Sequence, residues 1–320
     1  MAGHAVDGVV TDAGAVGGRP GALTEAVGAF LAESLERPLG DGVRQVTIPA
    51  PAAAPNPVLR GAGPGVFWAT PGGPVHAGLG AAVTVTGAGP ARFREIRSGA
   101  DALWSRIERV DHPDAAALTP RLFGGFAFLP GTSSPEWRPF GDATFVLPRL
   151  LYTRDGDRGR LAVTLTAEER ARSGPVGIIS EARELLDRLA DDAPDPAAGG
   201  RPVVGPPAAG ADARADWDRA VASIQRRIED GAAAKIVAAR SRSVPLQTVD
   251  VGAVLRRLER ESATAARFAF RLGEAVFLGA TPERLVTRSG LEVRTEALAG
   301  SVPAGSPTLE SKLLESLKDE

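Results

Sequence analysis

The chain has 320 residues, a formal net charge of −2 and no cysteine. The lack of cysteine excludes a disulfide scaffold, a zinc–thiolate centre and cysteine catalysis, and the balanced charge argues against a dedicated nucleic-acid binder. No apolar run is long enough for a membrane helix, and the N-terminus lacks the pattern of a signal peptide. We therefore expect a cytoplasmic protein of one large domain or two, with 43% hydrophobic residues to build its core.

The N-terminal half predicts a helix followed by strands. Apolar residues recur at helical spacing over residues 22–37. Short β-like runs cut by Gly and Pro follow between residues 43 and 95, which indicates antiparallel strands joined by turns. Helices are expected over 99–109 and 176–190, and strands over 122–130, 143–154 and 160–167.

The clearest boundary is a stretch rich in Pro and Gly. Residues 191–210 contain five prolines and four glycines, a composition that supports neither a helix nor a central strand. We expect an N-terminal part over 1–190, a linker or surface excursion over 191–211, and the first part of a catalytic core over 212–320.

Helices and strands also alternate in the C-terminal part. Asp216 is a plausible helix N-cap and Gly231 fits the end of that helix. Residues 234–244 alternate as a strand, with Lys235 on its apolar face. The other expected elements are a helix over 250–260, hairpins over 267–280 and 285–298 (the second turning at Ser289-Gly290), and a last helix opening at Ser306-Pro307.

Lys235 is the first candidate for chemistry. It is the only lysine in the first 311 residues, whereas arginine supplies 34 of the 37 Lys and Arg residues. An ammonium group can lose its proton when it is desolvated and a guanidinium cannot, so a site that needs a neutral amine as a base must use lysine. The alternative is one leftover lysine on an exposed strand face.

Two further candidates follow along the chain. In GATPER, Pro282 ends strand pairing and holds Glu283 at a strand end, where a carboxyl group with a raised pKa can act as a general acid. The alternative is a solvated turn residue paired with Arg284. In ALAGS, Gly300 lets backbone N–H groups approach a carboxylate closely, although an ordinary glycine turn is the alternative.

The order and spacing of these motifs resemble the chorismate-utilising enzymes, in particular the menaquinone-type members of the isochorismate synthase branch. The motifs are AAKIVAARSR, FLGATPERLV, TEALAGSVPAG and KLLESLKDE, with RLFGGFAF and FVLPRL upstream. The resemblance covers residues 120–320 well. It implies an α+β fold of two large facing antiparallel sheets with helices outside.

The resemblance also implies a reaction, the Mg²⁺-dependent conversion of chorismate to isochorismate for menaquinone or siderophore biosynthesis. Lys235 matches the base that activates water for attack at C2, and Glu283 matches the acid that protonates the departing C4 hydroxyl. Gly300 and Ser301 match the loop that contacts a substrate carboxylate, with Leu298 beside the ring. A monomer without nucleic-acid or membrane partners is expected.

Related activities differ at single positions. Anthranilate synthases lack a lysine at position 235, and aminodeoxychorismate synthases carry a nucleophilic lysine where this chain has Ala299. Both differences favour water as the nucleophile. Salicylate synthases, which also eliminate pyruvate, share Lys235 and Glu283 and stay open as an alternative.

One departure concerns the metal site. The family motif continues from Lys318-Asp319 through two residues to a Glu-His pair whose glutamate binds Mg²⁺, whereas this sequence stops at Glu320. Asp319 is therefore only adjacent to the expected site. We expect a C-terminally truncated chain that is inactive alone, and a catalytically inactive fragment lacking the metal site is the alternative from another functional class.

Overall fold

The computed structural model forms two compact units, Met1–Ala193 with Leu255–Glu320 (unit 1) and Pro194–Val254 (unit 2). The structure describes residues 20–60, 63–131, 134–191, 213–241, 243–245 and 249–296. The expected linker over 191–211 lies outside these residues except for Asp191, and so does the expected helix at Ser306-Pro307.

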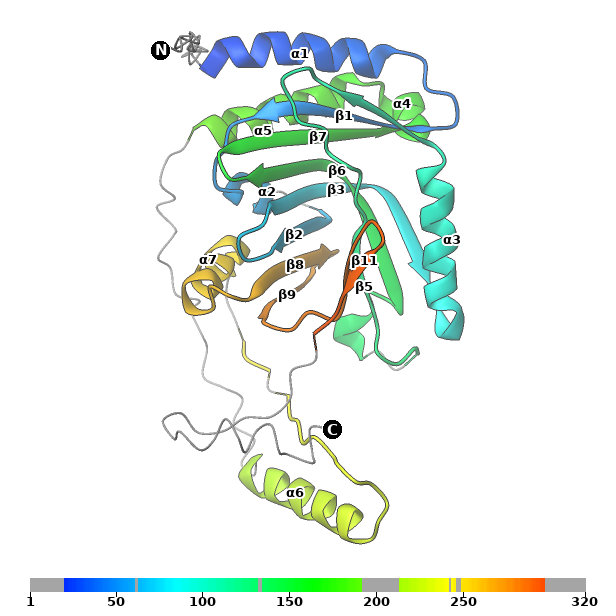
Figure 1. Ribbon diagram of the computed structural model, residues 1–320, viewed down its shortest axis with the longest axis vertical. Helices are drawn as coiled ribbons and strands as arrows, with labels where there is room; N and C mark the ends of the chain where they lie inside the picture. Colours follow the sequence, from blue (N-terminus) through cyan, green and yellow to red (C-terminus); the bar gives the residue numbers. More distant parts are fainter. Residues whose placement is uncertain are drawn as a thin grey trace, which may run out of the picture. The chain divides into compact units, whose positions relative to one another are not determined.

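Unit 1 is built on one nine-stranded mixed sheet with the order β4-β1-β7-β6-β3-β2-β8-β9, in which β5 also pairs with β6 (Figure 1). Its strands are antiparallel to their neighbours except for the parallel pair β1 and β4. The strands are β1 (Val43–Ala50), β2 (Gly65–Ala69), β3 (Val75–Gly87), β4 (Ile107–Asp111), β5 (Phe123–Phe126), β6 (Ala143–Asp155), β7 (Arg158–Thr166), β8 (Ala266–Leu272) and β9 (Ala275–Thr281).

The centre of the sheet is formed by the two longest strands, β3 and β6. Leu150, Leu151 and Tyr152 of β6 are almost fully buried although successive side chains point to opposite faces, so both faces of the sheet are covered here. The register between β3 and β6 shifts between Ala81 and Val83, which is typical of a β-bulge.

Helices cover the sheet of unit 1. α1 (Pro20–Glu36) and α5 (Val176–Ala190) pack against each other, and they also contact β1 and β7, respectively (Figure 1). α3 (Arg92–Trp104) lies along β3 and β6. The buried apolar stripe of α5 confirms the helix expected over 176–190, and each fully buried leucine in it contributes about 2 kcal/mol of apolar burial. The shorter helices are α2 (Asn56–Leu59), η1 (Gly89–Ala91), η2 (Pro135–Trp137) and α4 (Ala167–Ser173).

Unit 2 contains α6 (Ala213–Glu229) and the first turn of α7 (Val251–Glu261). α6 ends as expected: Gly231 has a φ of +71°, its N–H bonds to the Ile228 carbonyl at 3.0 Å, and the Ala232 N–H bonds to the Arg227 carbonyl at 2.9 Å. This is a glycine-terminated helix end. The expected N-cap at Asp216 is wrong, because α6 begins at Ala213 and Asp216 lies in its first turn. The helix expected over 250–260 is α7, and the Asp250 carboxylate caps it by accepting the Ala253 N–H at 3.1 Å.

Two other expectations are corrected. The helix expected over 99–109 runs from Arg92 to Trp104, and residues from Ile107 onward form β4 instead. Helical spacing does not reveal this break because β4 is held by its ladder to β1, more than sixty residues earlier. The strand expected over 234–244 is absent, since its described residues are irregular and pair with no described strand. Alternation alone cannot form a strand, because the backbone groups of a strand need a neighbour.

The predicted α+β fold is confirmed, but the two facing sheets are not seen in the described residues. These contain the nine-stranded sheet and one separate hairpin, β10 (Thr287–Ser289) with β11 (Glu292–Arg294). Ser289 pairs with Glu292, so the hairpin turns at Gly290-Leu291 rather than at Ser289-Gly290. Gly290, with a φ of +60°, is the turn residue that needs glycine.

Candidate active site

The β8–β9 hairpin carries Glu283 to the end of a strand. β8 and β9 pair from Leu272 with Ala275 through to Ala266 with Thr281, which leaves Gly273-Glu274 as a two-residue turn, with Gly273 at a φ of +57°. This confirms the hairpin expected over 267–280. The strand ends at Thr281, and Pro282 follows at once without an N–H to continue the ladder.

Glu283 is held at this strand end by one side chain. The Thr281 hydroxyl oxygen accepts the Glu283 N–H at 3.2 Å, and the same hydroxyl donates to the Glu283 carbonyl at 3.4 Å. Glu283 is exposed. This exposure agrees with the alternative of a solvated turn residue, but the ion pair of Arg284 in the described residues is with Glu296, at 3.0 Å.

A large cavity lined by aromatic side chains opens beside Thr281, and we call it the aromatic hollow. Its volume is about 840 Å³, and its walls come from β2, β5, β6, β8, β9 and the segment that joins β5 to β6. The aromatic residues that line it are Phe67, Trp68, Phe123, Phe126, Phe128, Trp137, Phe140, Phe145, Phe268, Phe270 and Phe277.

Contacts between these rings shape the aromatic hollow. The Trp137 ring meets the Phe277 ring edge-on at a centroid distance of 4.9 Å, and Phe277 also contacts Phe268 at 5.1 Å. Trp137 and Phe277 are each a little over 40% exposed, so the rings are open to a ligand. None of the described lining residues is charged. The aromatic hollow can therefore contact a ring or another apolar group, but it cannot balance the charge of a carboxylate.

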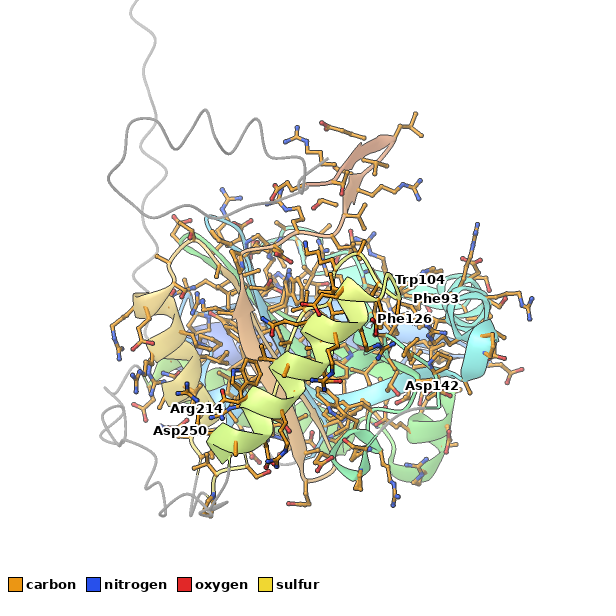
Figure 2. The ribbon with its side chains drawn as sticks, turned by 90° about the horizontal axis from the view of Figure 1, so that it is seen from below. Phe93, Trp104, Phe126, Asp142, Arg214 and Asp250 are labelled. Carbon is orange, nitrogen blue, oxygen red and sulfur yellow. The ribbon has the colours of Figure 1, made fainter. Side chains whose placement is uncertain are left out.

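Asp142, which precedes β6, holds the backbone at two glycines. Its two carboxylate oxygens accept the N–H groups of Gly131, at 2.8 Å, and Gly89, at 2.7 Å. The Gly131 hydrogen bond first, then the Gly89 one, hold the pKa of Asp142 below its usual value. Figure 2 shows Asp142 on the same side of the protein as Phe93 and Phe126, whose rings pack at 4.6 Å.

Lys235 lies in unit 2, on the irregular segment that follows α6. Its side chain is exposed, and so is that of Val237, which is 79% exposed. The expected apolar strand face around Lys235 is therefore not formed by the described residues. Glu283 belongs to unit 1.

The other expected site residues lie outside the part of the chain that the structure describes: Leu298, Gly300, Ser301 and Asp319. Within the described part, no three His, Asp or Glu side chains form a group that could hold a metal ion. No contact to a metal is therefore assigned to any described residue. No helix among them is long and apolar enough to cross a membrane.

Two features of the site were missed in the sequence. Phe268 and Phe270 alternate in RFAFRL and so share one face of a strand, which could have indicated an aromatic surface. Thr281 stands two residues before Glu283, the spacing at which a Thr hydroxyl bonds to backbone in a short turn. No local signal could have shown that Trp137 meets Phe277.

Comparison with known proteins identifies the family. Residues 43–320 match the family described as chorismate binding enzyme. The salicylate biosynthesis isochorismate synthase of Pseudomonas aeruginosa is 31% identical over 263 residues, which cover 80% of this chain and 53% of that protein. An isochorismate synthase of Bacillus subtilis is 29% identical over 219 residues, 67% of this chain and 44% of that protein.

The fold has a counterpart among solved structures. The menaquinone-specific isochorismate synthase from Escherichia coli aligns with a TM-score of 0.60 and 22% identity, covering 92% of this chain and 63% of the other. The chain spans about half the length of the curated relatives it matches.

Proposed function

This chain belongs to the chorismate binding enzyme family, and we propose that it takes part in the conversion of chorismate to isochorismate. Water adds at C2 of the ring, the ring double bonds shift, and the C4 hydroxyl leaves as water, so the reaction is an isomerisation. Lys235 is the base that takes a proton from the attacking water, and Glu283 is the acid that gives one to the leaving hydroxyl.

The observation that carries the proposal is the placement of Glu283. A general acid must be held at a defined position, and Glu283 follows a paired strand and is tied to its last residue. The names of the two relatives above support the same reaction. Lys235 adds support because an amine can serve as a base at a position where arginine, the prevalent cation of this chain, cannot.

The aromatic hollow bears on substrate binding. Chorismate is a dicarboxylate, and the described residues that line the aromatic hollow offer no cation. We therefore assign its carboxylates to groups outside the aromatic hollow, namely the expected loop at Gly300 and Ser301 and a bound Mg²⁺ ion that neutralises charge. If Mg²⁺ is required, EDTA will abolish turnover and added Mg²⁺ will restore it.

The experiment is an assay of the purified full-length gene product with chorismate and Mg²⁺, with products separated by chromatography. Isochorismate alone is the expected product. Salicylate together with pyruvate would replace the proposal by the salicylate synthase alternative, which Lys235 and Glu283 permit equally. Absence of any product, by a protein that is folded by circular dichroism, would contradict the proposal.

Two variants test the assigned roles. Lys235→Arg keeps the positive charge but removes the base, and Glu283→Gln removes the acid, so each is expected to lower kcat by 10²-fold or more. Glu274→Gln is the matched control, because Glu274 is exposed in the turn at the other end of β9. Unchanged turnover by Lys235→Arg would show that no neutral amine is needed.

A further inference from the structure

Glu283 lies in neither a helix nor a strand, so no regular backbone hydrogen bonds fix its position. β9 ends two residues earlier, and residues from Pro282 to Val286 are irregular and exposed. Pro282 between Thr281 and Glu283 stiffens the connection but has no N–H to anchor it. In the described structure, both hydrogen bonds that tie Glu283 down come from the Thr281 hydroxyl.

Thr281 itself is well anchored. It is the last residue of β9 and pairs with Ala266 of β8, and β8 is in turn paired with β2 inside the nine-stranded sheet. Its side chain shares a strand face with Phe277 and, like Phe277, lines the aromatic hollow. The hydroxyl therefore connects a rigid sheet to the exposed peptide that carries Glu283.

From this geometry we propose that Thr281 is a positioning residue for the reaction: its hydroxyl holds the Glu283 peptide so that the carboxyl group stays within reach of the leaving hydroxyl. This inference rests on the proposed function. Thr281 does not exchange a proton with the substrate. It acts through Glu283, because a backbone that swings freely would spend little time in the reactive arrangement, and a misplacement of about 1 Å can cost a factor of 10² in rate.

The test compares Thr281→Val, which has nearly the same shape without the hydroxyl, with Thr281→Ser, which keeps the hydroxyl. Thr287→Val is the matched control, because Thr287 is an exposed residue of β10 and its exchange removes the same atoms. Steady-state kinetics with chorismate are measured for each. Amide hydrogen exchange at Glu283 reports on the hydrogen bond without any need for turnover.

We expect Thr281→Val to lower kcat by about tenfold or more with little change in KM, and to speed exchange of the Glu283 amide, since the N–H loses its acceptor. Thr281→Ser should keep kcat and the exchange rate of the Glu283 amide near their wild-type values. Thr287→Val should leave the same two quantities unchanged. A merely structural role would lower the amount of folded protein without changing the kcat of the folded fraction.

Three results would overturn the inference: an unchanged kcat in Thr281→Val, an unchanged exchange rate at Glu283, or a loss in Thr281→Ser as large as in Thr281→Val. Failure of the proposed function gives a different set of results from failure of this inference. In that case wild-type protein forms no isochorismate, while the exchange rates still report whether Thr281 holds the Glu283 peptide.

Discussion

The guanidinium of Arg44 lies 2.6 Å from Oε2 of Glu108, across sixty-four residues of sequence. Arg44 is 2% exposed on β1, and the same guanidinium donates to the carbonyls of Ser34 and Arg37, at 2.9 and 2.8 Å, and of Pro38, at 2.8 Å. One buried side chain thus closes the C-terminal end of α1 and joins it to β4.

Removing this side chain should destabilise the protein strongly. Arg44→Met removes this donor from the Ser34 and Pro38 carbonyls, whereas Arg170 still donates to the Arg37 carbonyl. We expect a loss of about 3 kcal/mol in the free energy of unfolding, measured by urea denaturation. Glu108→Gln should cost less than about 1 kcal/mol, because the Glu108 side chain is half exposed. Equal losses in the two variants would mean that the ion pair, and not the carbonyl contacts, dominates.

Neighbouring glycines in β5 should respond differently to alanine. A Cβ at Gly124 would collide with the Thr144 carbonyl oxygen and lie 2.6 Å from Cα of Phe145, whereas a Cβ at Gly125 meets nothing within 4 Å. We expect Gly124→Ala to lower the free energy of unfolding by about 1–3 kcal/mol and Gly125→Ala to change it by less than about 1 kcal/mol. Thermal unfolding of the two variants checks this, and a similar Tm for both would contradict the geometry of β5.

Buried His76 should make the fold sensitive to acid. Its Nδ1 lies 3.0 Å from the Thr153 hydroxyl. Burial and then the positive charges of Arg121 and Arg160 lower the pKa of His76 to about 4, and the negative charge of Asp155 opposes this shift. The unfolded chain takes up this proton near pH 6.5, so stability should fall by roughly 3 kcal/mol as the pH drops from about 6.5 to about 4.

His76→Asn isolates this contribution, since asparagine can still bond to Thr153 but does not titrate. Urea denaturation between pH 7 and pH 4 should show a shallower loss in the variant than in the wild type, and both proteins share the titration of their carboxylates. Parallel curves would mean that His76 is protonated in the fold as easily as in the unfolded chain.

Tyr152 should anchor the segment that follows β1. The side chain is fully buried, and its hydroxyl accepts the Ala53 N–H at 2.9 Å and can donate to the carbonyl of Pro51, at 2.9 Å, or of Ala53, at 2.8 Å. Tyr152→Phe should cost about 1–3 kcal/mol and speed amide exchange at Ala53. Slow exchange in the variant would show that another group holds this segment.

The tyrosine also reports on its own burial. Burial raises the pKa of Tyr152 above its usual value, and it is the only tyrosine of the chain. Its ultraviolet absorbance should therefore titrate only above pH 10 while the protein is folded, and stability should fall as the pH rises into that range. Titration at or below the ordinary value would contradict the buried environment.

Local patterns predicted well the elements whose hydrogen bonds are local. α1, α5 and the end of α6 appear where periodicity and Gly231 placed them, and the β8–β9 hairpin turns where its sequence predicts. α3 begins at Arg92, earlier than helical spacing alone predicts, because Pro90 in the preceding turn marks the start of the helix. Leu298, Gly300, Ser301 and Asp319 remain predictions.

The sequence by itself determined the family motifs, the strand end at Pro282 and the choice of Lys235 and Glu283, because these depend on residue type and short spacing. Only the tertiary structure decided that residues 107–111 form a strand, that residues around Lys235 do not, and that Trp137 and Phe277 share one aromatic hollow. Strand ladders and ring contacts join segments far apart in the chain, and their free energy depends on partners that no local pattern contains.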